Sequence, residues 1–436
     1  MRTATPVRDR FTARAGGAWP DKQPQRLKNL MRHLLMVAFH FPPCAVSSGI
    51  QRTLRFARDL PQLGWQPVVL TAFKSAYERI SPDLLHEIPD GVFVHRAVAL
   101  DAARHLAIAG RYPAVLARPD RWASWGWPAT VAGWRLVRRF RPAAIWSTYP
   151  IATAHVIGFR IARMSGLPWV ADFRDPMAQD GYPEDPATWR AFARIEARTV
   201  RHAAASVFTT RGAARTYRQR YPDAARRVHV IENGFDEASF AGLDTMSRPA
   251  PDGRFTLVHS GVVYPSERDP THLFRALAAF KNSTPAPRLL VRFRASGHDA
   301  LIGSLARQFG VSDLVEIAPP LPYRAALEEM CRADGLLVLQ AANCNEQIPA
   351  KVYEYLRAHR PILALTDPRG DTADLLQRCG VRSIAPLDDA SAIQAALSEF
   401  LHKPEDFVPS ARSVRDCSRE SRARELAALL DSVVRG

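Results

Sequence analysis

The chain has 436 residues, of which 47% are hydrophobic, so it is globular and long enough for two or three domains of about 150 residues each. Lys and Arg total 59 against 43 Asp and Glu, giving a formal net charge of +16, which favours anionic partners such as nucleotides, phosphates, anionic lipids or nucleic acid. No apolar run reaches the roughly 18–20 residues of a membrane span. The five cysteines have no metal-ligand or redox spacing, and their odd number fits a reducing compartment.

Residues 1–30 are polar and basic, and they lack the apolar segment of a secretory signal. Two interpretations are open: a flexible basic arm, or translation that starts at Met31. We predict a cytoplasmic protein in both cases.

Strand-like and helix-like patterns alternate through residues 31–240. An apolar run at 33–39 is followed by a loop and then by a helical pattern that Gly64 ends. The next predicted strands are 66–71, 144–147, 169–171, 206–209 and 228–231, with helices at 151–165, 188–202 and from 212 onward. Their continuous apolar runs are typical of parallel strands buried on both faces.

Residues 75–130 fit this alternation poorly. Four aromatic residues lie near its end: Tyr112, Trp122, Trp125 and Trp127. One interpretation is an irregular insertion with an exposed aromatic patch for an acceptor. The other, which we favour, is ordinary packing of these rings against the sheet.

The polar stretch 244–253 predicts a linker before a second series of elements. Strands are predicted at 255–260, 289–294, 315–317, 335–339 and 361–365, and helices at 271–280, 301–309, 323–333, 350–357, 392–401 and from 371 onward. We therefore predict an α/β protein with two doubly wound, Rossmann-like domains, 31–240 and 254–410, facing each other across a cleft. In the final segment, 411–436, a helix near 421–434 is expected to pack back on the first domain. Ligands of such sheets bind beyond the carboxyl ends of the strands, so the cleft suits a nucleotide-linked substrate.

Two predicted loops at strand ends contain residues suited to a ligand. Gly49 opens a helix whose first amides are suited to bind a phosphate, although neither phosphate-binding glycine motif is present and a plain turn is the alternative. Glu346 lies in a loop, and Glu354 lies in the helix that follows Pro349. Both carboxylates could therefore reach one ligand. Glu354 is suited to accept hydrogen bonds from two ribose hydroxyls, and the helix start between the two is suited to bind a diphosphate.

The surrounding residues carry a resemblance. The segment Ile348-Pro349-Ala350-Lys351-Val352-Tyr353-Glu354-Tyr355-Leu356, followed by Arg360-Pro361-Ile362-Leu363-Ala364, resembles the donor-site helix and next strand of family-4 glycosyltransferases. That family has the GT-B fold, and its Glu-x7-Glu signature matches Glu346 and Glu354. Four further segments resemble family motifs in the family's order: Phe41-Pro42-Pro43 with Gly49, Arg52 and Gly64; 171–176; 231–236; and Ser260-Gly261 through Arg268-Asp269-Pro270. The resemblance covers about residues 31–400.

The resemblance implies a role for each matched position. Glu354 would bind the donor ribose, Glu346 would lie beside the transferred sugar, and Arg268 would neutralise the donor diphosphate. Lys351 would assist Arg268, with a solvated helix face as the alternative. The remaining candidates for donor or acceptor contact are Gly49, Gly261, Ile348 and Pro349.

Three charged residues of the first domain are further candidates. Asp172, Arg174 and Asp175 are predicted at a strand end that faces the cleft, either for catalysis or as a structural Asp–Arg pair. Two positions depart from the family: Val262 stands where an arginine is common, and a family histidine at the end of a first-domain strand has no match. His155 lies too far into the next helix to replace it.

We therefore expect a retaining transfer of sugar from a UDP- or GDP-sugar to a glycan or lipid-linked acceptor, in cell-surface polysaccharide synthesis, with no metal or other cofactor. The basic first domain would contact an anionic membrane surface at the inner face of the plasma membrane. One alternative is a nucleotide-sugar epimerase of GT-B fold, which needs no acceptor. Another is a non-catalytic GT-B scaffold, against which the intact Glu346/Glu354 pair argues. A nucleic-acid partner is not expected, because no nucleic-acid-binding module is recognisable.

Overall fold

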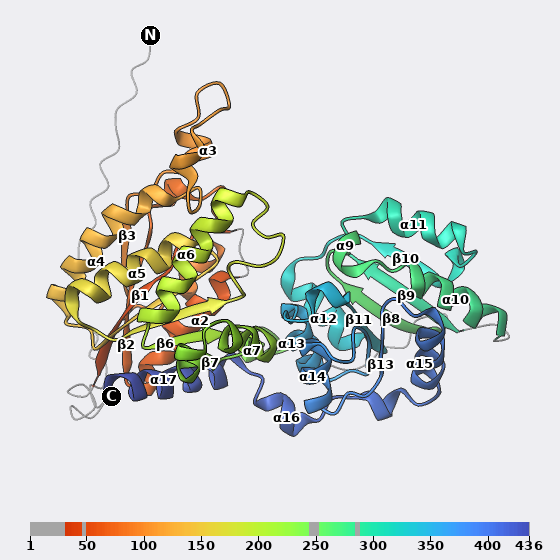
Figure 1. Ribbon diagram of the computed structural model, residues 1–436. Helices are drawn as coiled ribbons and strands as arrows, with labels where there is room; N and C mark the ends of the chain where they lie inside the picture. Colours follow the sequence, from red (N-terminus) through yellow and green to blue (C-terminus); the bar gives the residue numbers. More distant parts are fainter. Residues whose placement is uncertain (1–30, 46–48, 244–252, 284–287, 436) are drawn as a thin grey trace, which may run out of the picture.

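The computed structural model describes residues 31–45, 49–243, 253–283 and 288–435. The expectations for residues 1–30 and for the linker at 244–252 lie outside these residues. Two lobes, each built on a parallel β-sheet with helices packed against it, stand side by side (Figure 1). The predicted fold class, α/β with two doubly wound sheets, is therefore confirmed.

The first lobe contains a seven-stranded parallel sheet in the order β3-β2-β1-β4-β5-β6-β7. The strand order reverses between β1 and β4, and ligands of doubly wound sheets bind at such a reversal. The strands are β1 (Arg32–Val37), β2 (Trp65–Ala72), β3 (Phe93–Ala97), β4 (Ala144–Thr148), β5 (Trp169–Arg174), β6 (Ala205–Phe208) and β7 (Val228–Val230). The helices are α2 (Gly49–Asp59), α3 (Ala102–His105), α4 (Gly126–Phe140), α5 (Ala152–Ser165), α6 (Pro186–His202), α7 (Arg211–Arg220) and α8 (Glu237–Phe240).

Strand β1 shows why this sheet is buried on both faces. Leu35 and Val37 pack with the cluster that includes residues of α4 and α5, whereas Leu34 and Met36 pack with residues of α2 and the C-terminal helix. Successive side chains of a strand point to opposite faces, so a continuous apolar run supplies both layers.

Residues 75–130 contain an edge strand, β3, that the sequence pattern did not predict. Of the aromatic residues in this segment, Trp125 is fully buried and Trp122 packs on Phe39 with ring centroids 4.7 Å apart. Trp127 is largely exposed. Two of the rings therefore pack in the core, and no aromatic patch forms from the four together.

The second lobe contains a six-stranded parallel sheet in the order β10-β9-β8-β11-β12-β13, which reverses between β8 and β11. Its strands are β8 (Phe255–Ser260), β9 (Leu289–Arg294), β10 (Val315–Ala318), β11 (Gly335–Leu339), β12 (Ile362–Leu365) and β13 (Ile384–Ala385). The helices are α9 (Pro265–Arg268), α10 (Thr271–Ser283), α11 (Asp299–Gln308), α12 (Tyr323–Arg332), α13 (Ala350–Ala358), α14 (Asp371–Arg378) and α15 (Ala390–His402), followed by α16 (Ala411–Arg415) and α17 (Arg419–Arg435).

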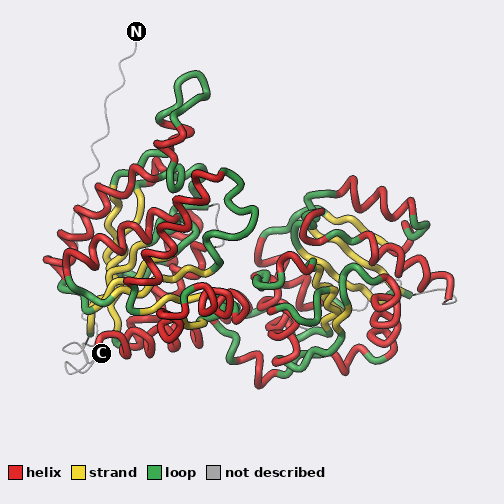
Figure 2. Tube along the Cα trace, in the orientation of Figure 1, coloured by secondary structure: helices red, strands yellow, loops and turns green. Residues whose placement is uncertain are grey.

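The chain passes between the lobes a second time through α16 and α17, and Figure 2 shows α17 lying under the first lobe as a long red helix. Leu426 and Leu430 of α17 are buried in the same cluster as residues of β1 and α2. The Trp65 indole donates a hydrogen bond to Asp431 at 3.0 Å. The last helix of the chain is thus part of the first lobe.

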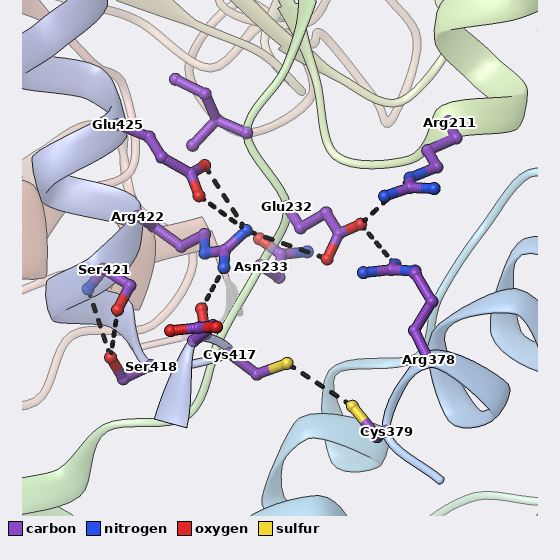
Figure 3. Close-up of polar contacts among 12 residues, drawn as sticks. Arg211, Glu232, Asn233, Arg378, Cys379, Cys417, Ser418, Ser421, Arg422 and Glu425 are labelled. Carbon is purple, nitrogen blue, oxygen red and sulfur yellow. Dashed lines mark hydrogen bonds and ion pairs between the residues drawn. The ribbon is translucent and has the colours of Figure 1, made fainter. Parts of the chain in front are cut away.

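A buried carboxylate lies where the two segments that connect the lobes meet, the one after β7 and the one that leads into α17 (Figure 3). Glu232 follows β7 and accepts a hydrogen bond from Arg378 of α14 at 2.7 Å. It also forms weaker ion pairs with Arg211 of α7 at 4.0 Å and with Arg422 of α17 at 3.8 Å. One side chain therefore joins the second lobe, the first lobe and the returning helix.

Candidate functional site

The loop after β11 and helix α13 form the centre of the candidate site. The Gln340 side-chain amide donates to the carbonyls of Cys344 and Gln347, at 2.7 and 2.9 Å, and so holds the loop. Pro349 occupies the N-cap position of α13, directly after Ile348. The backbone N–H of Ser260 donates to the Tyr355 hydroxyl at 2.8 Å. Helix α13 is thereby held beside the end of β8, at the reversal point of the second sheet.

Glu354, the second acidic residue of the Glu-x7-Glu pair, is a half-buried carboxylate on α13. The Tyr323 hydroxyl donates to its Oε1 at 2.9 Å. Burial raises the pKa of Glu354, although the Tyr323 hydrogen bond and the charges of Arg419 and Lys351 oppose this shift. Tyr323 also lines a groove of about 960 Å³ to which both lobes contribute, with Arg55 among its other residues.

Lys351, on the first turn of α13, lies against the backbone that follows β8. A Cβ atom placed on Gly261 would lie 3.1 Å from Lys351 Nζ, and Gly261 has a φ of +113°, a conformation that glycine tolerates best. Lys351 Nζ is 3.1 Å from Nε2 of His259, a fully buried residue of β8. Burial, followed by the charge of Arg268, lowers the pKa of Lys351 to about 7.

Arg268 ends α9 and turns back toward the same glycine turn. Its Nη1 donates to the Val262 carbonyl at 2.5 Å, and its guanidinium lies 5.3 Å from the centre of the Tyr264 ring. The structure therefore brings Arg268, Lys351 and Gly261 together, with Glu354 one turn further along α13.

Glu346, the first acidic residue of the pair, lies at the boundary between the lobes. Its carboxylate accepts a hydrogen bond from Thr216 of α7, and its carbonyl accepts one from Thr210 at 2.7 Å. Close by, the backbone N–H of Gly212 donates to both carboxylate oxygens of Asp371, at 2.9 and 2.8 Å. The second lobe therefore places a carboxylate at the positive N-terminal end of α7.

Asp172 belongs to β5 itself and is completely buried. Its two oxygens accept hydrogen bonds from Arg52 at 2.9 and 3.0 Å, and the Thr148 hydroxyl adds a third at 3.0 Å. Arg52 also donates to the carbonyls of Ile231 and Glu232. Asp172 therefore forms a buried ion pair, with Arg52 and not with Arg174.

Arg174 and Gly49 line a small hollow at the carboxyl ends of β1 and β4, together with His40, Thr148 and Tyr149. Arg174 adopts a φ of +63° and donates to the Tyr149 carbonyl at 3.3 Å. Burial raises the pKa of the neighbouring Asp175 despite the charge of Arg174. Thr148 lines this hollow and also donates to Asp172, so these first-lobe candidates lie near one another.

His155 has a structural role. It is fully buried, its Nδ1 lies 2.8 Å from the Ser147 hydroxyl, and burial lowers its pKa to about 3. It is therefore neutral and part of the core.

Sequence reasoning missed four residues that contact the candidate site: His259, Tyr323, Thr216 and Asp371. A signal existed for two of them, because His259 lies two positions before Gly261 and Tyr323 begins α12 directly after the proline-rich turn that follows β10. For Thr216 and Asp371 there was none, because their contacts depend on how the lobes dock.

The chain resembles known proteins in both family and fold. Residues 48–234 match the family described as glycosyl transferase 4-like domain. The sucrose-phosphate synthase from Thermosynechococcus elongatus superposes with a TM-score of 0.64 at 13% identity, covering 92% of this chain and 98% of that one. HepE from Anabaena in complex with UDP superposes with a TM-score of 0.63 at 14% identity, covering 92% of this chain and 100% of that one. A putative UDP-N-acetylglucosamine 2-epimerase from Listeria monocytogenes superposes with a TM-score of 0.58 at 10% identity, covering 92% of this chain and 96% of that one. No curated protein matches the chain by sequence.

The fold is thus GT-B, the two-lobed class of these solved structures. The family match covers most of the first lobe, and the likeness to the solved structures extends the shared fold over both lobes. Among the described residues, no helix is long and apolar enough to cross a bilayer.

Proposed function

We propose that this protein is a glycosyltransferase that moves a sugar, with retention at the anomeric carbon, from a UDP- or GDP-sugar to a glycan or lipid-linked acceptor in cell-surface polysaccharide synthesis. The observation that carries the proposal is the gathering of Glu354, Lys351, Gly261 and Arg268 at the reversal point of the second sheet. The solved structures of HepE with UDP, and with UDP and glucose, support a nucleotide-linked donor.

The proposed chemistry rests on positive charge at the leaving group. Arg268, Lys351 and the first amides of α13 would stabilise the diphosphate as it departs. Glu354 would accept hydrogen bonds from the ribose hydroxyls, and Glu346 would lie beside the sugar. The side chains named here supply this charge without a metal. We therefore expect transfer to persist in EDTA, and NMR of the product's anomeric proton would test retention.

We further propose that the first lobe reaches its acceptor at an anionic membrane surface. A backbone-paired turn at Ile108 and Arg111 projects beyond α3, with Ile108 84% and Val115 68% exposed. Between Asp101 and Asp120 the sequence contains three arginines and no acidic residue. Exposed apolar side chains among arginines are suited to the interface of an anionic bilayer.

This membrane contact predicts a selective loss of binding. Ile108→Glu should reduce co-sedimentation with phosphatidylglycerol vesicles several-fold, because it places a negative charge at the tip of the turn. Ile317→Glu, which changes an exposed residue of the second lobe, is the matched control and should bind like the wild type. Equal binding of all three proteins would contradict the proposed contact.

The test of the transfer reaction is nucleotide release from a panel of UDP- and GDP-sugars, with and without lipid-linked glycan acceptors. We expect acceptor-dependent release from one donor, and its loss in Glu354→Ala. Conversion of the donor without an acceptor would instead indicate an epimerase. The absence of release, together with no thermal shift by any donor, would indicate a non-catalytic scaffold.

A further inference from the structure

The turn after β8 has a valine at a position where the resembled family often has an arginine. Val262 offers no charge, and its side chain lies toward Gly297, where an added Cβ would come 3.2 Å from Val262 Cγ1. Its carbonyl accepts the Arg268 guanidinium. This turn therefore supplies one cation to a donor diphosphate, and a second must come from another element.

His259 can bind that second cation in only one tautomer. Its Nδ1 lies 2.9 Å from the carbonyl of Leu337 on β11. A carbonyl oxygen only accepts, so Nδ1 carries the proton and Nε2 is left with a lone pair. Nε2 faces Lys351 Nζ at 3.1 Å. Burial and the charges of Lys351 and Arg268 hold the pKa of His259 well below its usual value, so the imidazole stays a neutral acceptor.

We propose that His259 is a positioning residue that holds the Lys351 ammonium against Gly261, as the second cation for the donor diphosphate in place of an arginine at 262. The inference rests on the proposed function, because it assumes a nucleoside diphosphate in this lobe. Gly261 completes the arrangement, since a side chain at this position would contact Lys351 Nζ and Cε.

A consequence for pH follows from the charged and titratable groups around Lys351. Arg268 on α9 and burial disfavour its ammonium form, whereas Glu354 on its own helix favours it. His259 on β8 is the neutral partner. With a pKa of about 7, Lys351 is mostly uncharged at pH 8. A bound diphosphate stabilises the charged form, so binding at pH 8 should take up about one proton, and affinity should fall as pH rises above 7.

The experiment is calorimetry of the full chain with UDP, GDP and ADP from pH 6 to 9, in buffers of different ionisation enthalpy. The terminal phosphate of a nucleoside diphosphate is already ionised at pH 8, so the uptake reports on the protein. The matching nucleoside, which lacks the diphosphate, is the ligand control. Lys351→Met should take up no proton and should bind about 10–100-fold more weakly at pH 7, as expected for a charge-assisted hydrogen bond.

Substitutions of His259 separate positioning from folding. His259→Leu removes the acceptor, so we expect the fall in affinity to begin at lower pH and the donor KM at pH 7 to rise more than kcat falls. His259→Gln retains an oxygen that can accept from Lys351 and should restore the wild-type pH profile. In the Lys351→Met background, His259→Leu should cause no further loss of affinity.

The outcomes distinguish this inference from the proposed function. Binding without proton uptake, or a His259→Leu profile equal to that of the wild type, would overturn the inference and leave the proposed function standing. If none of the three nucleotides binds, the proposed function falls and this inference falls with it.

Discussion

Two acidic residues of this chain, Asp172 and Glu354, differ in how far their partners leave the carboxylate open to a ligand. Asp172 accepts three hydrogen bonds from two side chains and is fully buried, so its carboxylate is not accessible to a substrate. Glu354 accepts a hydrogen bond from Tyr323 at Oε1 and is half-buried beside the groove that Tyr323 lines. Its carboxylate therefore has capacity left for ribose hydroxyls.

Asp172→Asn should destabilise the fold without changing the pH dependence of transfer. It leaves the buried Arg52 guanidinium without its counter-charge, and breaking such a pair costs about 3–5 kcal/mol. The free energy of unfolding in urea would measure this loss. Glu420→Gln breaks an exposed pair with Arg424 and is the control, with an expected change below about 1 kcal/mol. If Asp172→Asn were as stable as the wild type but inactive, a catalytic role would be indicated.

Tyr323→Phe should shift the acidic limb of the donor-dependent pH profile. The Tyr323 hydrogen bond lowers the pKa of Glu354 against the raising effect of burial, so its removal raises that pKa. Glu354 must be ionised to accept ribose hydroxyls, and activity would therefore be lost at a higher pH than in the wild type. The profile of kcat/KM for the donor between pH 4.5 and 7 tests this. In Glu354→Gln this limb should be absent, and a Tyr323→Phe profile identical to that of the wild type would contradict the assigned contact.

At the level of elements, the strongly apolar strands were predictable from sequence, whereas the 15-residue helix α4 was not predicted. Strands β9 and β11 have the predicted bounds, 289–294 and 335–339, because continuous apolar runs between turn residues identify buried parallel strands. The edge strands β3 and β13 were missed, since one is only half-buried and the other has two residues. The Glu-x7-Glu segment was located correctly at the start of α13. The contacts of this segment with His259 and Thr216 could not be predicted, because these contacts join segments that are distant in sequence.

Glycines inside helices provide a test of how closely α5 approaches the sheet. A Cβ at Gly158 of α5 would lie 2.7 Å from Trp169 Nε1 and 2.9 Å from Ser147 Oγ, so Gly158→Ala must displace a buried, hydrogen-bonded pair. We expect a loss of about 1–3 kcal/mol. In α11, a Cβ at Gly303 meets only ordinary contacts, at 3.5 Å or more. Gly303→Ala should therefore stabilise by about 0.5–1 kcal/mol through helix propensity. Urea unfolding measures the change in the free energy of unfolding for each variant. Changes of the same sign in both variants would contradict the packing described.

Across the whole molecule, polar contacts between the lobes hold them in register, and three of them involve acidic side chains named above. The Glu346 carboxylate accepts from Thr216, Asp371 accepts from the N-terminus of α7, and Glu232 binds Arg378 across the junction. The first contact involves a residue expected beside the transferred sugar. Donor binding would therefore change the strength of the contact between Glu346 and α7. Through this contact, the arrangement of the lobes would depend on whether the donor site is occupied.

A substitution of Glu232 tests the arrangement of the two lobes without changing a residue of the candidate donor site. Glu232→Gln removes the charge that Arg211, Arg378 and Arg422 share. We therefore expect a loss of about 1.5–3 kcal/mol, typical of hydrogen bonds to charged groups, together with a larger radius of gyration in small-angle X-ray scattering. Glu237→Gln, five residues further along, breaks a more exposed ion pair that also joins the lobes, with Arg357 of α13, and should change stability by less than about 1 kcal/mol. Similar effects of both variants would mean that Glu232 is only another surface charge. A loss confined to Glu232→Gln would show that the lobes are joined through this buried carboxylate.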